Sequence, residues 1–542
     1  MPITHFLESN ARRWPDSVAL VEINPSLART ASDWREFSLV ETAAEPGYRK
    51  ELTWQAFDDR ANQIANLLLG AGIKRGEKVA LLLMNCLEWL PVYFGILKTG
   101  ALAVPMNFRY TSPEIEYCLK LADCKALIFG PEFIERVGAL PDAGRPGLMW
   151  FIGNEHVIFA RDMEREANAM AVSNPSVTLT DEDNAAIYFS SGTTGFPKAI
   201  LHDHGALVCA CETEQAHHGQ TREDVFLCIP PLYHTGAKMH WFGTLIVGGR
   251  AVLLRGTQPE WILRAASVER ASIVWLLVPW AQDIMDAIDR GAVRLSDYDL
   301  SAWRLMHIGA QPVPPSLIKR WRALFPNHDY DTNYGLSESI GPGAVHLGVE
   351  NLHKVGAIGV AGVGWQAKIV GDQGDETATD EVGELIVAGR GVMKEYYKDP
   401  AATAAALKDG WLYTGDMARR DADGFIWLVD RKKDVVITGG ENLYPVQIED
   451  FLRGLEQIKD VAVIGLPDAR LGEIAAAIIE RKPDAALTQE DVEAFCHGLP
   501  RYKRPRRIIF DTVPRNLTGK IEKPKLRERY CAARLVEAET TR

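Results

Sequence analysis

Short apolar runs alternate with helix-like segments over residues 60–130, and this alternation constrains the fold more than any other feature of the chain. Residues 78–83 and 126–129 have the composition of buried strands, whereas residues 89–98 have a helical pattern. Strands separated by helices form parallel, right-handed βαβ units. Because a second series of this kind runs from residue 225 to 309, we predict an α/β protein with two βαβ-type subdomains.

The pattern changes after about residue 355. Short strands and turns follow one another at residues 367–370, 383–387 and 425–429, which predicts a β-rich subdomain. From residue 460 onward the chain has the pattern of a compact α/β unit. At 542 residues the chain exceeds what one hydrophobic core usually supports, so we expect at least two domains.

Composition excludes several classes of protein. With 47% hydrophobic and 24% charged residues the chain is globular, and its net charge of −12 argues against a nucleic-acid partner. No run approaches the roughly 20 apolar residues of a membrane span, and the N-terminus lacks a signal-peptide pattern. The eight cysteines show no Cys-x-x-Cys spacing. We therefore predict a soluble cytoplasmic protein with reduced thiols and no stable membrane insertion. The sequence leaves its oligomeric state open, with a homodimer as one alternative.

A loop rich in hydroxyl groups lies within residues 188–200, directly after an apolar strand at residues 185–189. Glycines let backbone N–H groups approach a phosphate, hydroxyls donate hydrogen bonds, and an ammonium neutralises charge. The lysine does not follow the last glycine directly, so this is not the Walker-type loop. The residues that we predict to bind a polyphosphate are Ser190, Ser191, Gly192, Thr193, Thr194, Gly195 and Lys198.

This loop resembles the phosphate loop of the adenylate-forming superfamily, which includes acyl- and aryl-CoA synthetases, peptide-synthetase adenylation domains and firefly-type luciferases. Four further stretches resemble motifs of that superfamily in the same order, so the resemblance covers essentially the whole chain. They are Asn333–Glu338, Tyr413–Asp416, Asp430–Glu449 and Asn516–Lys520.

The resemblance implies a reaction in two steps. A carboxylate attacks the α-phosphate of ATP to give an acyl-adenylate, and a thiol, usually that of coenzyme A, then displaces AMP. The resemblance implies ATP and Mg²⁺ as cofactors and coenzyme A as a co-substrate. The resemblance also implies a large N-terminal domain (1–430), a hinge at 431–433 that pivots about Lys433, and a small mobile C-terminal α+β domain (434–542).

The resemblance assigns a role to each motif residue. Ser337 is expected at the α-phosphate, Glu338 at Mg²⁺, and Asp416 and Arg431 at the ribose and phosphates. Lys520 is expected to reach the α-phosphate and the carboxylate during adenylation. The adenine side is assigned to Gly309, Ala310, Gln311, Asn333, Tyr334 and Gly335, and the passage for pantetheine to Gly439 and Gly440.

Residues 230–241 align with the acid-pocket helix of the superfamily, and His234 matches its aromatic or histidine gate. They contain no acidic side chain, which argues against an amino-acid substrate. We predict an AMP-forming acyl-CoA synthetase for an apolar carboxylic acid, with medium-chain, aryl and alicyclic acids all open. The alternative is an adenylation enzyme that loads a carrier protein. The other residues predicted on the acid side are Gly236 and Ala237, whose small size leaves room, and Trp241, Trp280 and Ala310.

Overall fold

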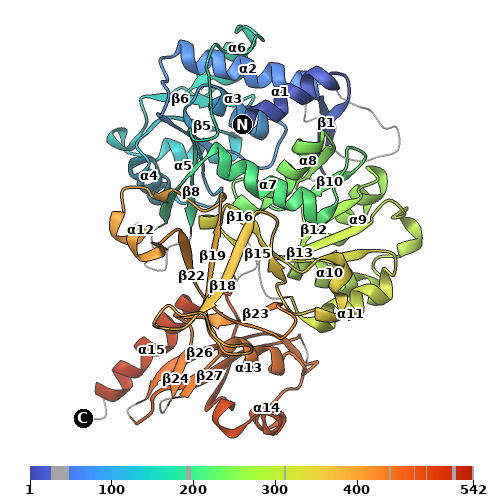
Figure 1. The fold of residues 1–542 in the computed structure, drawn as a ribbon, viewed down its shortest axis with the longest axis vertical. Coiled ribbons are helices and arrows are strands. Elements are labelled where there is room, and N and C mark those ends of the chain that lie inside the picture. Colours follow the sequence, from blue (N-terminus) through green and yellow to red (C-terminus); the bar gives the residue numbers. More distant parts are fainter. Residues whose placement is uncertain are drawn as a thin grey trace.

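Figure 1 shows a computed structural model of the protein, in which a large upper part and a small lower part follow one another along the chain. The residues that the structure describes are 1–25, 48–190, 197–309, 313–438, 441–468, 470–483, 485–515 and 521–539.

The first large sheet has seven strands in the order β14-β13-β12-β10-β11-β1-β2. All neighbouring strands are parallel except β1 and β2, as the predicted βαβ alternation requires. Its strands are β1 (Val18–Asn24), β2 (Tyr48–Thr53), β10 (Val225–Cys228), β11 (Arg250–Leu254), β12 (Ile273–Leu277), β13 (Leu305–Gly309) and β14 (Asp329–Asp331), and its helices are α8 (Thr235–Val247), α9 (Pro259–Val268), α10 (Val278–Asp289) and α11 (Pro315–Leu324).

The second large sheet has eight strands in the order β20-β9-β8-β4-β3-β5-β6-β7. Strands β3 to β6 are parallel neighbours, whereas β8 and β9 form an antiparallel hairpin that ends at the pair Ser190 and Lys198. Its strands are β3 (Lys78–Leu82), β4 (Leu102–Pro105), β5 (Cys124–Phe129), β6 (Leu148–Phe151), β7 (Arg161–Asp162), β8 (Asn184–Ser190), β9 (Lys198–Asp203) and β20 (Glu395–Tyr396). The helices around it are α1 (Thr4–Arg13), α2 (Trp54–Gly70), α3 (Trp89–Lys98), α4 (Ser112–Leu121), α5 (Ile134–Gly138), α6 (Met163–Asn168) and α7 (His204–His218).

The β-rich part connects the large sheets to the lower part of the molecule (Figure 1). A small sheet contains the Asn333–Glu338 motif, and a larger one pairs β22 with β19 and β23. Its elements are β15 (Asn333–Leu336), β16 (Gly341–His346), β17 (Val360–Ala361), β18 (Trp365–Val370), β19 (Gly383–Gly389), α12 (Pro400–Ala406), β21 (Leu407–Lys408), β22 (Trp411–Arg420) and β23 (Ile426–Arg431).

The C-terminal part builds a sheet of its own, in which β24, β25, β26 and β27 are antiparallel and β28 adds in parallel. Its two hydrophobic clusters consist only of residues between 436 and 531. The hinge at 431–433 itself stays a prediction. The elements are β24 (Val436–Thr438), β25 (Glu441–Leu443), α13 (Pro445–Leu452), β26 (Ile458–Asp468), β27 (Gly472–Arg481), α14 (Gln489–Phe495), β28 (Arg507–Phe510) and α15 (Lys523–Glu539).

Local sequence signals explain where several helices begin. Thr53 accepts a hydrogen bond from the Ala56 N–H before α2, and Thr111 forms a capping box with Glu114 before α4. Asp203 caps α7 by accepting a hydrogen bond from the Ala206 N–H. Within the described ranges no helix is both long enough and apolar enough to cross a bilayer. The structure has no disulfide among the eight cysteines, all of which lie in described segments.

Candidate active site

Lys198 and Glu338 both contact Tyr396, the first over its ring and the second at its hydroxyl. The Lys198 ammonium is 4.7 Å from the centroid of the Tyr396 ring, and the Tyr396 hydroxyl donates a 2.8 Å hydrogen bond to Glu338 Oε1. Burial and the neighbouring Glu338 carboxylate raise the pKa of Tyr396 far above its ordinary value, so the hydroxyl stays protonated and remains a donor. The predicted phosphate cation and the predicted metal ligand are therefore positioned together.

Tyr334, Asp416 and Arg431 form a second group. The Tyr334 hydroxyl donates a 2.6 Å hydrogen bond to Asp416 Oδ2, and Arg431 Nε lies 3.3 Å from Asp416 Oδ1. Asp416 and Arg431 face each other on the paired strands β22 and β23. The Asp416 carboxylate raises the pKa of Arg431, and burial together with Asp416 raises that of Tyr334. A neutral phenol and a cation thus fix the orientation of this carboxylate.

The segment from Asn333 to Glu338 joins the two groups, because Tyr334 stands near its start and Glu338 at its end. Within it, Gly335 lies so close to β16 that a Cβ atom there would be 1.8 Å from the Gly341 carbonyl oxygen. Ser337, the residue predicted to contact the α-phosphate, has its carbonyl 2.8 Å from Nε2 of the buried His202 on β9. The turn is therefore attached to the hairpin that leads into the phosphate loop.

Two of the predicted adenine-side residues, Gly309 and Asn333, lie next to each other. Gly309 ends β13, and a Cβ there would be 4.0 Å from the Asn333 carbonyl oxygen. The Asn333 amide, however, donates a 2.5 Å hydrogen bond to Glu214 Oε1 on α7. In this structure the Asn333 side chain is thus engaged with a buried carboxylate of the protein.

A buried ionic network lies around the predicted hinge. Asp430, 7% exposed, accepts a 2.9 Å hydrogen bond from the Val446 N–H of α13, and Asp434 pairs with Arg527 of α15 at 2.7 Å. Lys523 Nζ lies 2.8 Å from Glu449 Oε1, and its positive charge acts to lower the pKa of Asp430. Lys433 itself lies at the surface. Partial desolvation and the cationic neighbours Arg431 and Arg527 lower the pKa of its ammonium group. Charges therefore tie the end of β23 to the C-terminal part.

The predicted acid side is only partly assembled. His234 is half-buried at the N-cap of α8, and Ala237 is fully buried one turn further on. The space beside Gly236 is taken by Trp275, whose Cη2 would be 2.8 Å from an added Cβ, so the small residue makes room for a neighbouring ring. Trp280 is partly buried at the start of α10 between two hydrophobic clusters.

Trp241 was predicted to form a pocket wall, but its ring is fully buried between Phe57 and Phe94, with centroids 6.0 and 5.9 Å away. This tryptophan packs in the core between α8 and the helices α2 and α3, so we do not assign it to the acid. The resemblance of residues 230–241 to the acid-pocket helix suggested a pocket wall, but an apolar aromatic side chain on such a helix also suits core packing, and the sequence could not separate the two.

Several predicted site residues lie outside the described residues: Ser191, Gly192, Thr193, Thr194, Gly195, Ala310, Gln311, Gly439, Gly440 and Lys520. The described residues are paired across three of these four gaps. Ser190 pairs with Lys198, Thr438 with Glu441, and Arg515 with Ile521.

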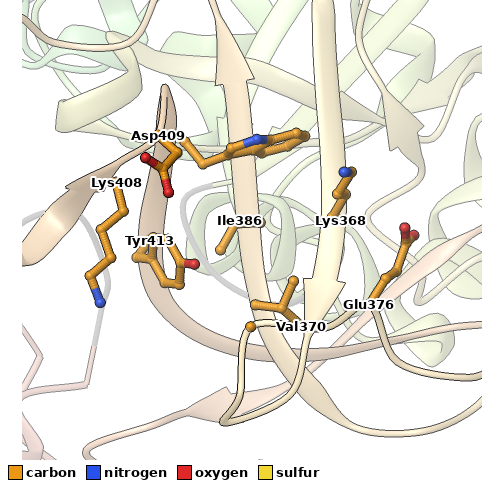
Figure 2. A pocket seen from close by; sticks show the side chains of 9 residues that line it. Lys368, Val370, Glu376, Ile386, Lys408, Asp409 and Tyr413 are labelled. Atoms are coloured by element: carbon orange, nitrogen blue, oxygen red, sulfur yellow. The ribbon is translucent and has the colours of Figure 1, made fainter.

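Figure 2 shows a hollow of about 240 Å³ on the β18–β19–β22 sheet. Lys368, Lys408, Asp409, Trp411 and Tyr413 are among the residues that line it. Apart from Tyr413, which precedes the Thr-Gly-Asp residues of its motif, no residue predicted from the motifs lines this hollow. The motif residues group elsewhere, and they, not this hollow, form the candidate active site.

The sequence did not point to Tyr396 or His202, which hold Glu338 and the Ser337 turn. Both come from segments without motif character, and only the pairing of β9 with β20 and the turn after β15 brings them to the site. The only sequence signal that could have drawn attention to Tyr396 was the pair of adjacent tyrosines at 396–397.

The α/β units, the small C-terminal sheet and the grouping of the motif residues define the adenylate-forming class of enzymes. The chain belongs to the family of AMP-binding enzymes: that family's model matches residues 7–397, and the model of the AMP-binding enzyme C-terminal domain matches residues 447–520. The predicted superfamily and fold class are confirmed.

Similar proteins extend over nearly the full chain. A long-chain-fatty-acid–CoA ligase, FadD13 of Mycobacterium tuberculosis, is 33% identical over 503 residues, which cover 91% of this chain and 96% of the relative. A feruloyl-CoA synthase of Amycolatopsis sp is 32% identical and covers 88% and 94% of the two chains. Among solved structures, the anthranilate CoA ligase AuaEII in complex with anthranoyl-AMP superposes with a TM-score of 0.84 at 25% identity, covering 99% of this chain and 98% of that one.

Proposed function

We propose that this protein is an AMP-forming carboxylic acid–CoA ligase that activates an apolar acid. One observation carries the assignment to ATP chemistry: Lys198 and Glu338 converge at one end of the Asn333–Glu338 segment, and Asp416 and Arg431 converge at its other end. A nucleoside triphosphate needs charge neutralisation at its phosphates and a carboxylate acceptor at its ribose, and this segment joins the two.

Adenylation forms a bond between an acid oxygen and the α-phosphorus and breaks the bond from that phosphorus to the bridging oxygen, so pyrophosphate leaves. Lys198 neutralises charge on the β- and γ-phosphates, and Asp416, oriented by Tyr334 and Arg431, accepts the ribose hydroxyls. The carboxylate oxygens of Glu338 are hard donors that suit Mg²⁺, which when bound would offset phosphate charge. Lys520 is proposed at the α-phosphate, as in the superfamily.

Thioester formation then transfers the acyl carbon from phosphate oxygen to the sulfur of coenzyme A, and AMP leaves. The remaining assignments follow the superfamily motifs. Ser190 to Gly195, with Ser337, hold the phosphates, while Gly309 to Gln311 and Asn333 to Gly335 flank the adenine. Gly439 and Gly440 let pantetheine pass, and the C-terminal domain turns about Lys433.

The acid pocket is proposed at His234, Gly236, Ala237, Trp280 and Ala310. Residues 230–241 bring no carboxylate to this region, which disfavours an ammonium-bearing substrate. The names of related enzymes refer to a long-chain fatty acid, an aryl acid and an alicyclic propanoyl acid. The class of acid that this protein takes is therefore a question for experiment. A cytoplasmic location and the oligomeric state also stay predictions.

The test is a panel of medium-chain, aryl and alicyclic acids, assayed for AMP release with and without coenzyme A. We expect at least one acid to give AMP release that coenzyme A accelerates, with the acyl-CoA detected by mass. Release that coenzyme A does not accelerate would favour the carrier-protein-loading alternative. Failure of every acid in a preparation that binds ATP would refute the proposal.

A further inference from the structure

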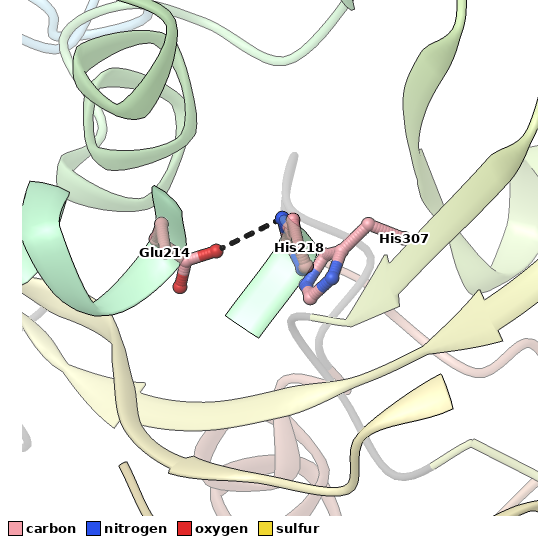
Figure 3. Close-up of side chains that lie close together, drawn as sticks. All are labelled: Glu214, His218 and His307. Carbon is pink, nitrogen blue, oxygen red and sulfur yellow. Dashed lines mark ion pairs between the residues drawn. The ribbon is translucent and has the colours of Figure 1, made fainter. Parts of the chain in front are cut away.

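Five ionisable side chains converge in the interior close to Asn333. Glu214 and His218 lie on α7, and Figure 3 shows them beside His307 of β13. Asp331 ends β14, and His346 ends β16. All five are fully buried. Two groups of three among them, Glu214–His218–His307 and His218–Asp331–His346, have potential ligand atoms within 4.8 Å of one another.

The second group has the spacing of metal ligands. Asp331 Oδ2 lies 3.3 Å from His218 Nε2 and 3.5 Å from His346 Nδ1. Ligands bound at 2.0–2.1 Å at the corners of a tetrahedron stand about 3.3–3.4 Å apart. Both contacts are longer than the about 2.7–2.9 Å of a charge-assisted hydrogen bond, and the His346 contact lies at the outer limit of a hydrogen bond. The other oxygen, Asp331 Oδ1, accepts hydrogen bonds of 2.7 and 2.9 Å from the N–H groups of Thr332 and Gly348, which orients Oδ2 toward the two rings.

Glu214 lies where an outer carboxylate of a metal site is expected. Its two oxygens face the ring nitrogens that point away from Asp331, at 3.6 Å from His218 Nδ1 and 3.4 Å from His346 Nε2. Metal-bound histidines usually donate their second N–H to a carboxylate, which fixes the tautomer and orients the ring. These two contacts are, like those of Asp331, longer than an ordinary hydrogen bond, but one carboxylate that faces both histidines suits a site in which the opposite nitrogens bind an ion.

We propose that His218 Nε2, Asp331 Oδ2 and His346 Nδ1 bind a divalent transition-metal ion of the zinc class, with Glu214 as the outer carboxylate. Imidazole and carboxylate ligands suit Zn²⁺ and its neighbours. The site is separate from Glu338, the proposed Mg²⁺ ligand. The ion would fasten the end of α7 to β14 and β16, which flank the Asn333–Glu338 segment, and Glu214 connects it to Asn333 directly. Its role is structural support for that segment.

The metal content of the full-length protein tests the proposal. Purified without added chelator or after incubation with Zn²⁺, the protein should retain about one zinc per chain through gel filtration. X-ray absorption at the zinc edge should show nitrogen and oxygen at about 2.0–2.1 Å and no sulfur at about 2.3 Å. Zinc that is not retained, or zinc bound by sulfur from the eight cysteines, would overturn the site.

Variants locate the ion. His346→Gln should abolish stoichiometric retention, and Glu214→Gln should weaken Zn²⁺ binding about 10–100-fold. The control His328→Gln, a buried histidine stacked on Trp303 with centroids 4.6 Å apart, should retain the metal. His307→Gln should retain it as well; loss there together with retention in His346→Gln would assign the ion to the other group and refute this one. If a variant fails to fold, the X-ray absorption spectrum of the wild-type protein still decides whether nitrogen and oxygen bind the zinc.

Discussion

At the scale of single residues, Tyr396 is the side chain on which the phosphate end of the site depends. Its ring lies under the Lys198 ammonium and its hydroxyl holds Glu338, so one residue contacts both the proposed phosphate cation and the proposed metal ligand. The ring and the hydroxyl can be separated by mutation.

Tyr396→Phe keeps the ring and removes the donor. A hydrogen bond to a charged group contributes about 1.5–3 kcal/mol, so pyrophosphate exchange into ATP should fall about 10–100-fold, with a higher Mg²⁺ requirement. Tyr397→Phe removes only a 3.3 Å hydrogen bond to Asp123 and serves as the control. Equal activity of the two variants would contradict the role of the Tyr396 hydroxyl.

Residue roles were predictable where a motif matched and not where a contact depended on the fold. Glu338, Asp416 and Arg431 were assigned through the resemblance of their motifs to those of the superfamily, and the structure groups Asp416 with Arg431. Tyr396 and the His218–Asp331–His346 group lie on elements far apart in sequence, so no spacing marks them. Trp241 shows the opposite error, because an aromatic side chain on an apolar helix fits a pocket wall and a core equally well.

At the scale of elements, the close approach of β15 and β16 sets the shape of the Asn333–Glu338 segment. Gly335 permits this approach because a Cβ atom would lie 1.8 Å from a backbone oxygen. Backbone cannot yield as a flexible side chain can, so the strands would have to separate.

Gly335→Ala should therefore lower the thermal unfolding midpoint and weaken ATP binding, at a cost of about 1–3 kcal/mol or more. Calorimetry and nucleotide titration measure the two effects. Gly147→Ala is the matched control, since a Cβ there meets nothing within 4 Å. A Gly335→Ala protein as stable as the Gly147→Ala protein would refute the packing argument.

The elements themselves were largely predicted, because hydrophobic period and capping are local properties. The helix predicted at 89–98 has those bounds, and the strand predicted at 78–83 is β3 at 78–82. Helix α2 begins at Trp54, ahead of the alternation that the sequence shows over residues 60–130, because Thr53 caps it. The antiparallel pairing of β8 with β9 was not evident, since a strand's partner is not encoded in its own period.

At the scale of the whole molecule, the charges around Asp430 hold the C-terminal part against the end of β23. Burial raises the pKa of Asp430 to about 6, although Lys523 opposes the shift. An acid with a raised pKa stabilises the folded state most when it is protonated. Its contribution is fully present below about pH 4 and is lost as the pH rises through about 6.

Asp430→Asn removes this titration. The unfolding free energy of the wild type relative to the variant should fall by up to about 3 kcal/mol between pH 4 and 7. Thermal midpoints of both proteins across that range measure the difference. Asp372→Asn, at an exposed turn, should show no such trend. A difference between wild type and Asp430→Asn that stays constant with pH would contradict the prediction.

Lys520→Ala tests the proposed division of labour between the two parts. We expect pyrophosphate exchange to slow by about 10²–10³-fold, as for loss of one preorganised electrostatic contact. Thioester formation from a supplied acyl-adenylate should change much less, because Lys520 is proposed to act only in the first step. Exchange at the wild-type rate would refute this role.

The sequence by itself determined the family, the α/β class and most residues proposed to meet ATP, because these depend on local patterns and ordered motifs. Only the tertiary structure decided which side chains meet across distant elements. Tyr396 reaches Glu338 through the pairing of β9 with β20, and three histidines gather with two carboxylates where α7, β13, β14 and β16 come together. The reason is physical: such contacts depend on how sheets and helices pack, and packing joins residues of separate elements whose separation along the chain leaves no local trace.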